Sequence, residues 1–181
     1  MKKNMMICAA GLAFMLPQTA SAQDWNGIYV GGQLGYNSYD VDTDVDGLTY
    51  GVVAGFGGTS GGLYGAIEAE FNLSNVEGEG SGVEFEENSI GAINLIAGAP
   101  IAPNTLLYGK LGFFRSDVEY EIFGVNFDDT GTGYELAFGG EFALQNNLSI
   151  RGEVGFFDGE FDDVDVEFDG TSLSLGVISR F

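Results

Sequence analysis

The sequence predicts an all-β fold, an eight-stranded antiparallel up-and-down transmembrane β-barrel. Three observations support this prediction. Apolar residues alternate with Gly, Ser, Asn and Glu in eight segments, and this period of two is typical of strands with one apolar face. Each segment has about ten residues, enough to cross a bilayer when tilted by about 45°. No acidic residue falls on the apolar face of any of these segments.

The positions of the eight strands follow from this alternation. In the first strand, Ile28 and Leu34 fall on the apolar face, whereas Tyr29 and Gln33 fall on the other face. In lipid every backbone polar group needs a partner within the protein, so strands that span a membrane must close into a barrel. The predicted strands cover residues 27–37, 48–57, 63–73, 89–98, 105–115, 133–143, 148–157 and 171–181.

The predicted connections alternate between short turns that contain Gly, Pro or Asn and long acidic segments. The short connections are Gly58–Gly62, Ala99–Asn104 and Leu144–Asn147, and the long ones are residues 38–47, 74–88, 116–132 and 158–170. Outer-membrane barrels have short periplasmic turns and longer extracellular loops. We therefore expect both ends of the mature chain to lie in the periplasm.

The first 22 residues predict a secretory signal peptide. A positive start at Lys2 and Lys3 precedes an apolar run from Met5 to Leu16, which is too short to span a bilayer as a helix. Ala20-Ser21-Ala22 then provides the small residues of a cleavage site. We expect cleavage after Ala22 and a mature chain of one barrel domain, residues 23–181.

The composition excludes several kinds of catalytic site. The chain has no histidine, and its one cysteine, Cys8, lies in the predicted signal peptide. The mature chain therefore lacks the residues for a Ser-His-Asp triad or a cysteine nucleophile, and we predict that it is not an enzyme. It carries 27 acids and four bases, a net charge of −23, so we expect no nucleic-acid partner.

The acidic residues follow the predicted strand map. Of the 27 acids, 21 fall in the four long connections and Asp24 precedes the first strand. The other five fall on polar strand faces together with three bases, and an eight-stranded barrel has just enough interior room for such side chains to fill it. We expect a salt-bridged network in the lumen, because unpaired buried charges are costly. Its predicted members are Glu68, Glu70, Lys110, Glu135, Glu141, Arg151, Glu153 and Arg180.

Two acidic runs are candidates for weak divalent-cation contacts. Residues 42–47 match the start of a calcium-binding loop, but the twelfth position is Val53 instead of Glu. Oxygen ligands of this kind hold Ca²⁺ or Mg²⁺, which could bridge the protein to anionic lipopolysaccharide. The other interpretation is a solvated acidic rim with no cofactor. The candidate contacts are Asp40, Asp42, Asp44, Asp46, Asp162, Asp163 and Asp165. Alternation within residues 117–122 and 163–169 also predicts that some strands continue beyond the membrane.

Several segments resemble the small porin-family outer-membrane β-barrel proteins of alphaproteobacteria. The resemblance is carried by Trp25–Gly32, Tyr64–Phe71, Gly139–Leu144, Asn147–Glu153 and Ser174–Phe181. It implies an outer-membrane location and a final strand, with Gly176 and the terminal Phe181, that serves as the signal for the barrel-assembly machinery. The sequence departs from the family at Ser179, where an aromatic residue is frequent, and at Ile96, where an inward Arg is usual.

Two functions stay open at this point. One is a structural or surface-interaction (adhesion-like) role, in which acidic extracellular loops contact a surface ligand and the barrel contacts outer-membrane lipid and lipopolysaccharide. The alternative is a narrow porin-like channel for ions or small solutes. The two differ in whether the lumen conducts.

Overall fold

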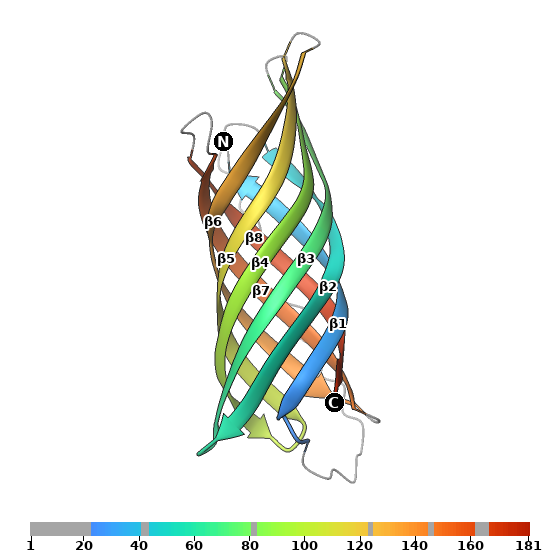
Figure 1. The fold of residues 1–181 in the computed structure, drawn as a ribbon, viewed down its shortest axis with the longest axis vertical. Helices are drawn as coiled ribbons and strands as arrows, with labels where there is room; N and C mark the ends of the chain where they lie inside the picture. Colours follow the sequence, from blue (N-terminus) through green and yellow to red (C-terminus); the bar gives the residue numbers. More distant parts are fainter. Residues whose placement is uncertain (1–22, 41–43, 81–82, 123–124, 145–146, 162–166) are drawn as a thin grey trace, which may run out of the picture.

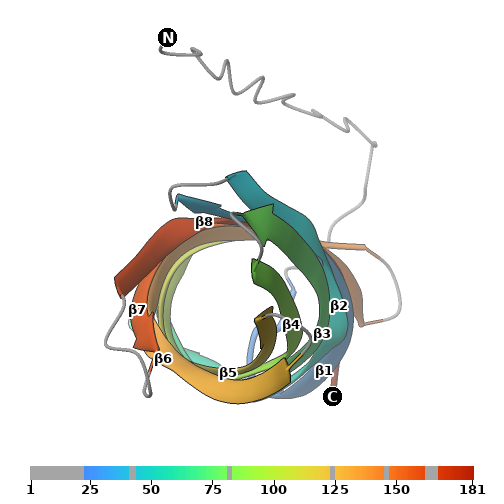
Figure 2. The ribbon, with the colours of Figure 1, turned by 90° about the horizontal axis from the view of Figure 1, so that it is seen from above.

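The computed structural model describes residues 23–40, 44–80, 83–122, 125–144, 147–161 and 167–181. The predicted signal peptide lies outside these residues. The eight strands are β1 (Gly27–Asp40), β2 (Asp44–Ser60), β3 (Leu63–Gly80), β4 (Val83–Ala102), β5 (Thr105–Ile122), β6 (Val125–Ala143), β7 (Leu148–Phe161) and β8 (Glu167–Arg180). Each strand pairs antiparallel with the next, and β8 pairs with β1, so the sheet closes into the predicted barrel (Figures 1 and 2).

The barrel is inverted relative to a water-soluble protein, with apolar side chains outside and polar ones inside. Leu34 and Phe113 are 68% and 64% exposed, whereas Glu68 and Asn94 are buried in the lumen. An apolar outer face is stable against lipid, and the side chains of the alternate residues of each strand must fill the narrow interior. The predicted assignment of the two strand faces is confirmed. None of the described residues forms a helix that is long and apolar enough to cross a membrane.

The short connections and both described ends of the chain lie at one end of the barrel, here called the turn end. Gly61 and Gly62 have φ values of +61° and +85°, which glycine adopts without strain. The backbone N–H of Gln23 donates to the carbonyl of Pro103, at the β4–β5 turn, over 2.8 Å. The N–H of Phe181 donates to the carbonyl of Ile28, also over 2.8 Å. The opposite end is called the far end.

The strands are longer than predicted, and the difference lies mostly at the far end. At the turn end β2 and β4 also extend, so that residues 58–60 and 99–102 lie in strands instead of the predicted short connections. They span 14 to 20 residues, and 17 of the 21 acids assigned to long loops lie within strands. The long-loop prediction was therefore wrong for most of these residues. The predicted continuation as strands is confirmed for residues 117–122 and 167–169, whereas residues 163–166 lie outside the described residues. Beyond lipid a strand needs no apolar outer face, so the alternation that marks a membrane strand ends before the strand does.

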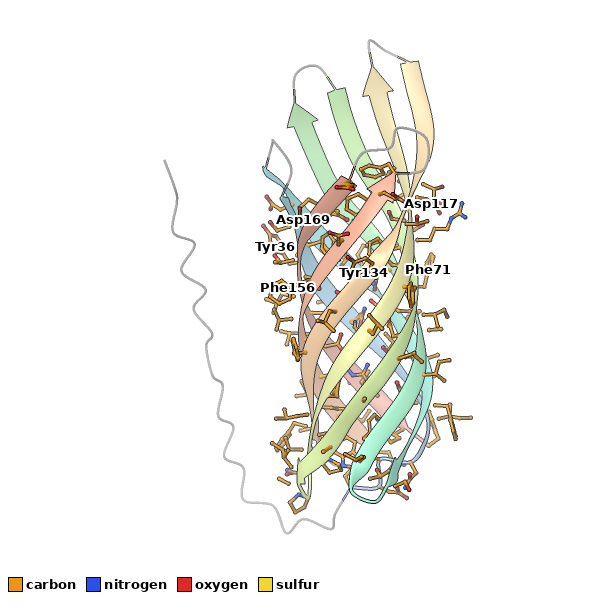
Figure 3. All side chains as sticks on the ribbon, turned by 90° about the vertical axis from the view of Figure 1, so that its left-hand side faces the viewer. Tyr36, Phe71, Asp117, Tyr134, Phe156 and Asp169 are labelled. Carbon is orange, nitrogen blue, oxygen red and sulfur yellow. The ribbon has the colours of Figure 1, made fainter. Side chains whose placement is uncertain are left out.

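Four strands continue as a sheet beyond the rest of the barrel (Figures 1 and 3). The β2–β3 pairing ends at Asp46–Glu77, and the β6–β7 pairing ends at Gly131–Phe161. Pairing between β3, β4, β5 and β6 continues to the ends of those strands. We call this part, residues 77–80, 83–87, 118–122 and 125–129, the far-end sheet.

A bulge at the base of the far-end sheet changes which face each β4 residue occupies. The register shifts between Glu87 and Ser89, so that Asn88 is an extra residue on β4. Positions 83 and 85 consequently pair with positions 122 and 120 of β5. These β5 positions share a strand face with Val118, which is buried, so this face is the lumen side. An unbroken alternation from the lower part of β4 would have put them on the outer face.

Candidate functional site

The lumen holds two groups of charged side chains, and the group nearer the turn end is balanced. Arg151, on β7, contacts Glu68 on β3 and Glu141 on β6, the latter at 3.1 Å. Arg180, on β8, lies 3.1 Å from the other oxygen of Glu141. Two guanidiniums thus meet two carboxylates, all buried, and link four strands across the barrel. In a low-dielectric interior such groups are stable only when they are paired in this way.

The second group, nearer the far end, carries an excess of negative charge. The ammonium of Lys110 lies 2.7 Å from Glu153, 3.2 Å from Glu135 and 3.6 Å from Glu70. The hydroxyl of Tyr108 also donates to Glu153. One cation therefore serves three carboxylates. Glu135 and Glu70 are the less buried members, at 19% and 12% side-chain exposure.

Amide side chains stabilise the carboxylate that is farthest from the ammonium. Gln33 and Asn72 donate to one oxygen of Glu70, each over 2.6 Å, and Asn94 donates to the other over 3.0 Å. These hydrogen bonds to a charged acceptor offset part of the cost of burying it. All eight residues that the sequence placed in a lumen network therefore lie in the lumen and form ion pairs there, and a 3.9 Å contact between Arg151 and Glu153 joins the two groups.

Apolar clusters lie on both sides of the charged groups in the lumen. At the turn end the buried cluster consists of Trp25, Tyr64, Ile96, Leu106, Tyr108 and Ala143. Toward the far end Tyr39, Val76, Phe157 and Phe168 form a second cluster, packed with Phe114 and Phe161. The cavity between Lys110 and this second cluster has a volume of about 60 Å³, enough for a few water molecules. Within the described residues the arrangement suits a packed plug better than a pore.

The two residues predicted to form the assembly signal lie on β8 and directly after it. Gly176 faces the lumen, as its place on the polar face predicted. Phe181 follows the last strand residue at the turn end, and it is 74% exposed on the outer side. An exposed terminal aromatic beside the β1–β8 seam is accessible to another protein, and its proposed use as an assembly signal stays a prediction.

The candidate cation contacts do not form a described metal centre. Asp40 and Asp44 are paired across the β1–β2 hairpin, and Asp46 lies in β2, where it accepts a hydrogen bond from the Tyr36 hydroxyl. Asp42, Asp162, Asp163 and Asp165 lie outside the described residues. Among the residues that the structure describes, no group of three or more acids is placed to hold a metal ion. Weak Ca²⁺ or Mg²⁺ binding therefore stays a prediction.

The far-end sheet brings acids together in a way that the sequence did not reveal. The register pairs acidic positions directly opposite one another on adjacent strands. One row runs across β2 to β6 and consists of Asp46, Glu77, Glu86, Glu119 and Asp128. A second row consists of Glu79, Glu84 and Glu121. On the opposite wall Asp158 faces Asp169, and Glu160 faces Glu167.

One further residue, Arg115, was missed by the sequence reasoning. Three of the four bases after residue 22 lie in the lumen, but Arg115 is exposed on the outer side of β5. It falls on the same strand face as Leu111 and Phe113, so strict alternation would have found a charge on the apolar face. Its guanidinium donates to the Thr130 hydroxyl over 3.2 Å.

Comparison with known proteins agrees with this architecture. The family described as "Outer membrane protein beta-barrel domain" matches residues 6–181. The chain belongs to this family. A curated relative of this outer-membrane barrel is the 22 kDa outer membrane protein of Rhizobium leguminosarum bv. viciae, which is 27% identical over 169 residues, covering 88% of this chain and 80% of the relative.

Solved structures of other outer-membrane barrels share the fold. Neisserial surface protein A (NspA) superposes with a TM-score of 0.59 at 15% identity, covering 91% of this chain and all of that one. Ail, the attachment invasion locus protein of Yersinia pestis, superposes with a TM-score of 0.56 at 15% identity, covering 86% and 99%. At these identities the likeness concerns the fold alone.

Proposed function

We propose that this outer-membrane barrel is a non-enzymatic surface-interaction protein, whose far-end sheet faces the outside of the cell and binds a cationic partner. The turn end, with both ends of the mature chain, faces the periplasm. Short periplasmic turns and longer outer segments are the general rule for such barrels, which supports this orientation. The attachment protein Ail has the same fold, which supports a role in adhesion.

The acid row across β2 to β6 is the observation that carries the proposal. Like charges directly opposite one another destabilise a sheet by some tenths of a kcal/mol per pair. The sequence has no Lys or Arg between residues 116 and 150, and the three lumen bases are already paired. Among the residues that the structure describes, Arg115 is thus the one base on the outer side that could neutralise these acids. The remaining charge is available to a positively charged partner, with long-range attraction that depends on salt.

The acidity of the chain also indicates which partners are unsuitable. Ail has been solved in complex with sucrose octasulfate, a heparin analogue. A sulfated ligand of that kind would be repelled by the acid rows of the far-end sheet. We therefore expect the surface ligand of this chain to be a basic protein or peptide, and we expect no nucleic-acid partner.

Binding of a lysine-rich peptide tests the proposal. The refolded barrel is titrated into a fluorescent Lys-rich peptide at low and at physiological ionic strength, and anisotropy is measured. The quadruple variant Glu77→Gln, Glu86→Gln, Glu119→Gln and Asp128→Asn should bind at least about tenfold more weakly. The matched control changes the same charge on the opposite wall, with amides at Asp158, Glu160, Glu167 and Asp169. Equal loss in both quadruple variants, or no binding at low salt, would refute the proposed surface.

A conductance measurement tests the alternative function, a narrow channel. The two apolar clusters support a closed lumen, so we expect no stable conductance from the wild-type barrel in planar bilayers. Steady single-channel currents that change when Lys110 is replaced by Met would overturn the proposal in favour of a narrow pore.

A further inference from the structure

Arg115 lies at a defined depth in the barrel, at the upper limit of the apolar outer surface. It is ten residues from Thr105, the start of β5 at the turn end. With a rise of about 3.3 Å per residue and a tilt of about 45°, that distance is about 23 Å along the barrel axis. The lipid-facing band of such barrels is about 25 Å tall. The guanidinium is therefore placed where acyl chains end and headgroups begin.

The neighbouring side chains change character at this level. Phe113, two residues nearer the turn end, is 64% exposed on the lipid side, whereas the exposed Asp117 lies two residues farther along. Figure 3 shows the aromatic side chains of Tyr36, Phe71, Tyr134 and Phe156 at a similar height, with Asp117 and Asp169 above them. Aromatic residues in such a girdle mark the membrane–water boundary.

Next to Arg115 the outer wall has a position without a side chain, Gly91, which is here called the notch. Gly91, on β4, pairs with Arg115 on one side and with Phe71 on the other. A side-chain carbon at Gly91 would have no neighbour within 4 Å, so the position is open space on the outer wall. Its exposed neighbours are Phe71 across β3, Ile93 along β4, and Phe113 next to Ile93 on β5. The notch is thus bordered by apolar side chains and by the guanidinium of Arg115.

The guanidinium retains donors for an external anion. One nitrogen donates to the Thr130 hydroxyl, and no described carboxylate lies within ion-pair distance of Arg115. The nearest acid along the strand, Asp117, accepts a hydrogen bond from the Ser89 hydroxyl over 3.2 Å. The planar fork of an arginine binds phosphate oxygens through two parallel hydrogen bonds.

We propose that Arg115 and the notch at Gly91 bind a phosphorylated glycolipid of the outer leaflet, with the phosphate on Arg115 and an acyl chain against the phenylalanines. The remaining outer surface at this level carries acids, including Asp46, Asp158 and Asp169, which repel phosphate. The site would thus hold one lipid at a fixed position on the barrel wall. This assignment to the outer leaflet rests on the orientation proposed above, and it is independent of the cationic partner.

Lipid retention measured by native mass spectrometry tests the proposal. The probe is a bisphosphorylated lipid A in detergent micelles with EDTA, which prevents metal-bridged contacts to the acids. Arg115→Gln should weaken its retention by roughly tenfold, since one charge-assisted bidentate contact is lost. Gly91→Leu, which fills the notch, should also weaken it. The matched control is Gly65→Leu, another outward glycine nearer the turn end, and it should retain lipid like the wild type.

The comparison lipids separate the alternatives. Dephosphorylated lipid A should be retained as weakly by the wild type as the phosphorylated form is by Arg115→Gln. Unchanged retention in Arg115→Gln, or equal retention of the dephosphorylated lipid, would overturn the site. Stronger retention of phosphatidylglycerol than of lipid A, still dependent on Arg115, would overturn the outer-leaflet assignment. Heat-modifiable gel mobility of each variant shows that it is folded, so a loss of lipid reports on the site.

Discussion

Replacing Glu141 by Gln is expected to destabilise the barrel more than any other single carboxylate-to-amide change in the lumen. Glu141 is fully buried and contacts both Arg151 and Arg180 at 3.1 Å. Arg151 would keep Glu68 as a partner, but among the described residues Arg180 has no other carboxylate. Its remaining contacts are the carbonyl of Trp25, the Tyr64 hydroxyl and three aromatic rings.

The magnitude follows from the loss of one partner in a buried pair. Such a change typically costs about 3–5 kcal/mol, because a buried charge is left uncompensated. Glu135→Gln is the matched control, since Glu135 is 19% exposed and Lys110 keeps Glu153 at 2.7 Å and Glu70 at 3.6 Å. We expect this control to cost less than about 1 kcal/mol.

Equilibrium unfolding by urea in lipid vesicles measures both values. Gel mobility with and without heating reports the folded fraction, and fluorescence of Trp25, which lies beside Arg180, gives an independent probe. Coincident transitions by the two probes would justify a two-state analysis. Equal effects of Glu141→Gln and Glu135→Gln, or a cost below about 1 kcal/mol for Glu141→Gln, would refute the claim that Glu141 neutralises Arg180.

Three further predictions concern the packing, the turns and the far-end sheet. Gly139→Ala should cost about 1–3 kcal/mol in the same unfolding assay because its new carbon would overlap the Tyr108 ring, whereas Gly109→Ala, with its nearest neighbour at 3.9 Å, should be nearly neutral. Asn147 has a φ of 64°, so Asn147→Ala should cost about 1 kcal/mol and Asn147→Gly should not; equal values would contradict the role of this turn conformation. Replacing residues 77–87 and 119–128 by short Gly-rich turns should preserve heat-modifiable folding, since the lumen network lies nearer the turn end, and should abolish binding of the Lys-rich peptide; loss of folding would show that the far-end sheet is part of the barrel's stable core.

The membrane part of this fold could be predicted from local sequence. Lipid imposes one preference on every spanning strand, apolar side chains at outward positions, and most outward positions of these strands follow it. Leu34, Phe113 and Leu175 therefore identified outward faces, and Glu68 and Arg151 were assigned to the lumen before any contact was known. A closed barrel then followed, because no backbone polar group can remain unpaired in lipid.

The tertiary structure decided everything that depends on pairing between distant strands. Glu68 and Arg151 are 83 residues apart, and no local pattern indicates that they meet. The bulge at Asn88 places positions 83 and 85 on the lumen-side face and aligns Glu86 with Glu119, which creates the acid row. Cross-strand register is set by the whole ladder of hydrogen bonds, and a shift of one residue exchanges the two faces of a strand. The sequence alone therefore determined which residues face lipid and which face the lumen, whereas only the register decided which charges are partners and which repel one another.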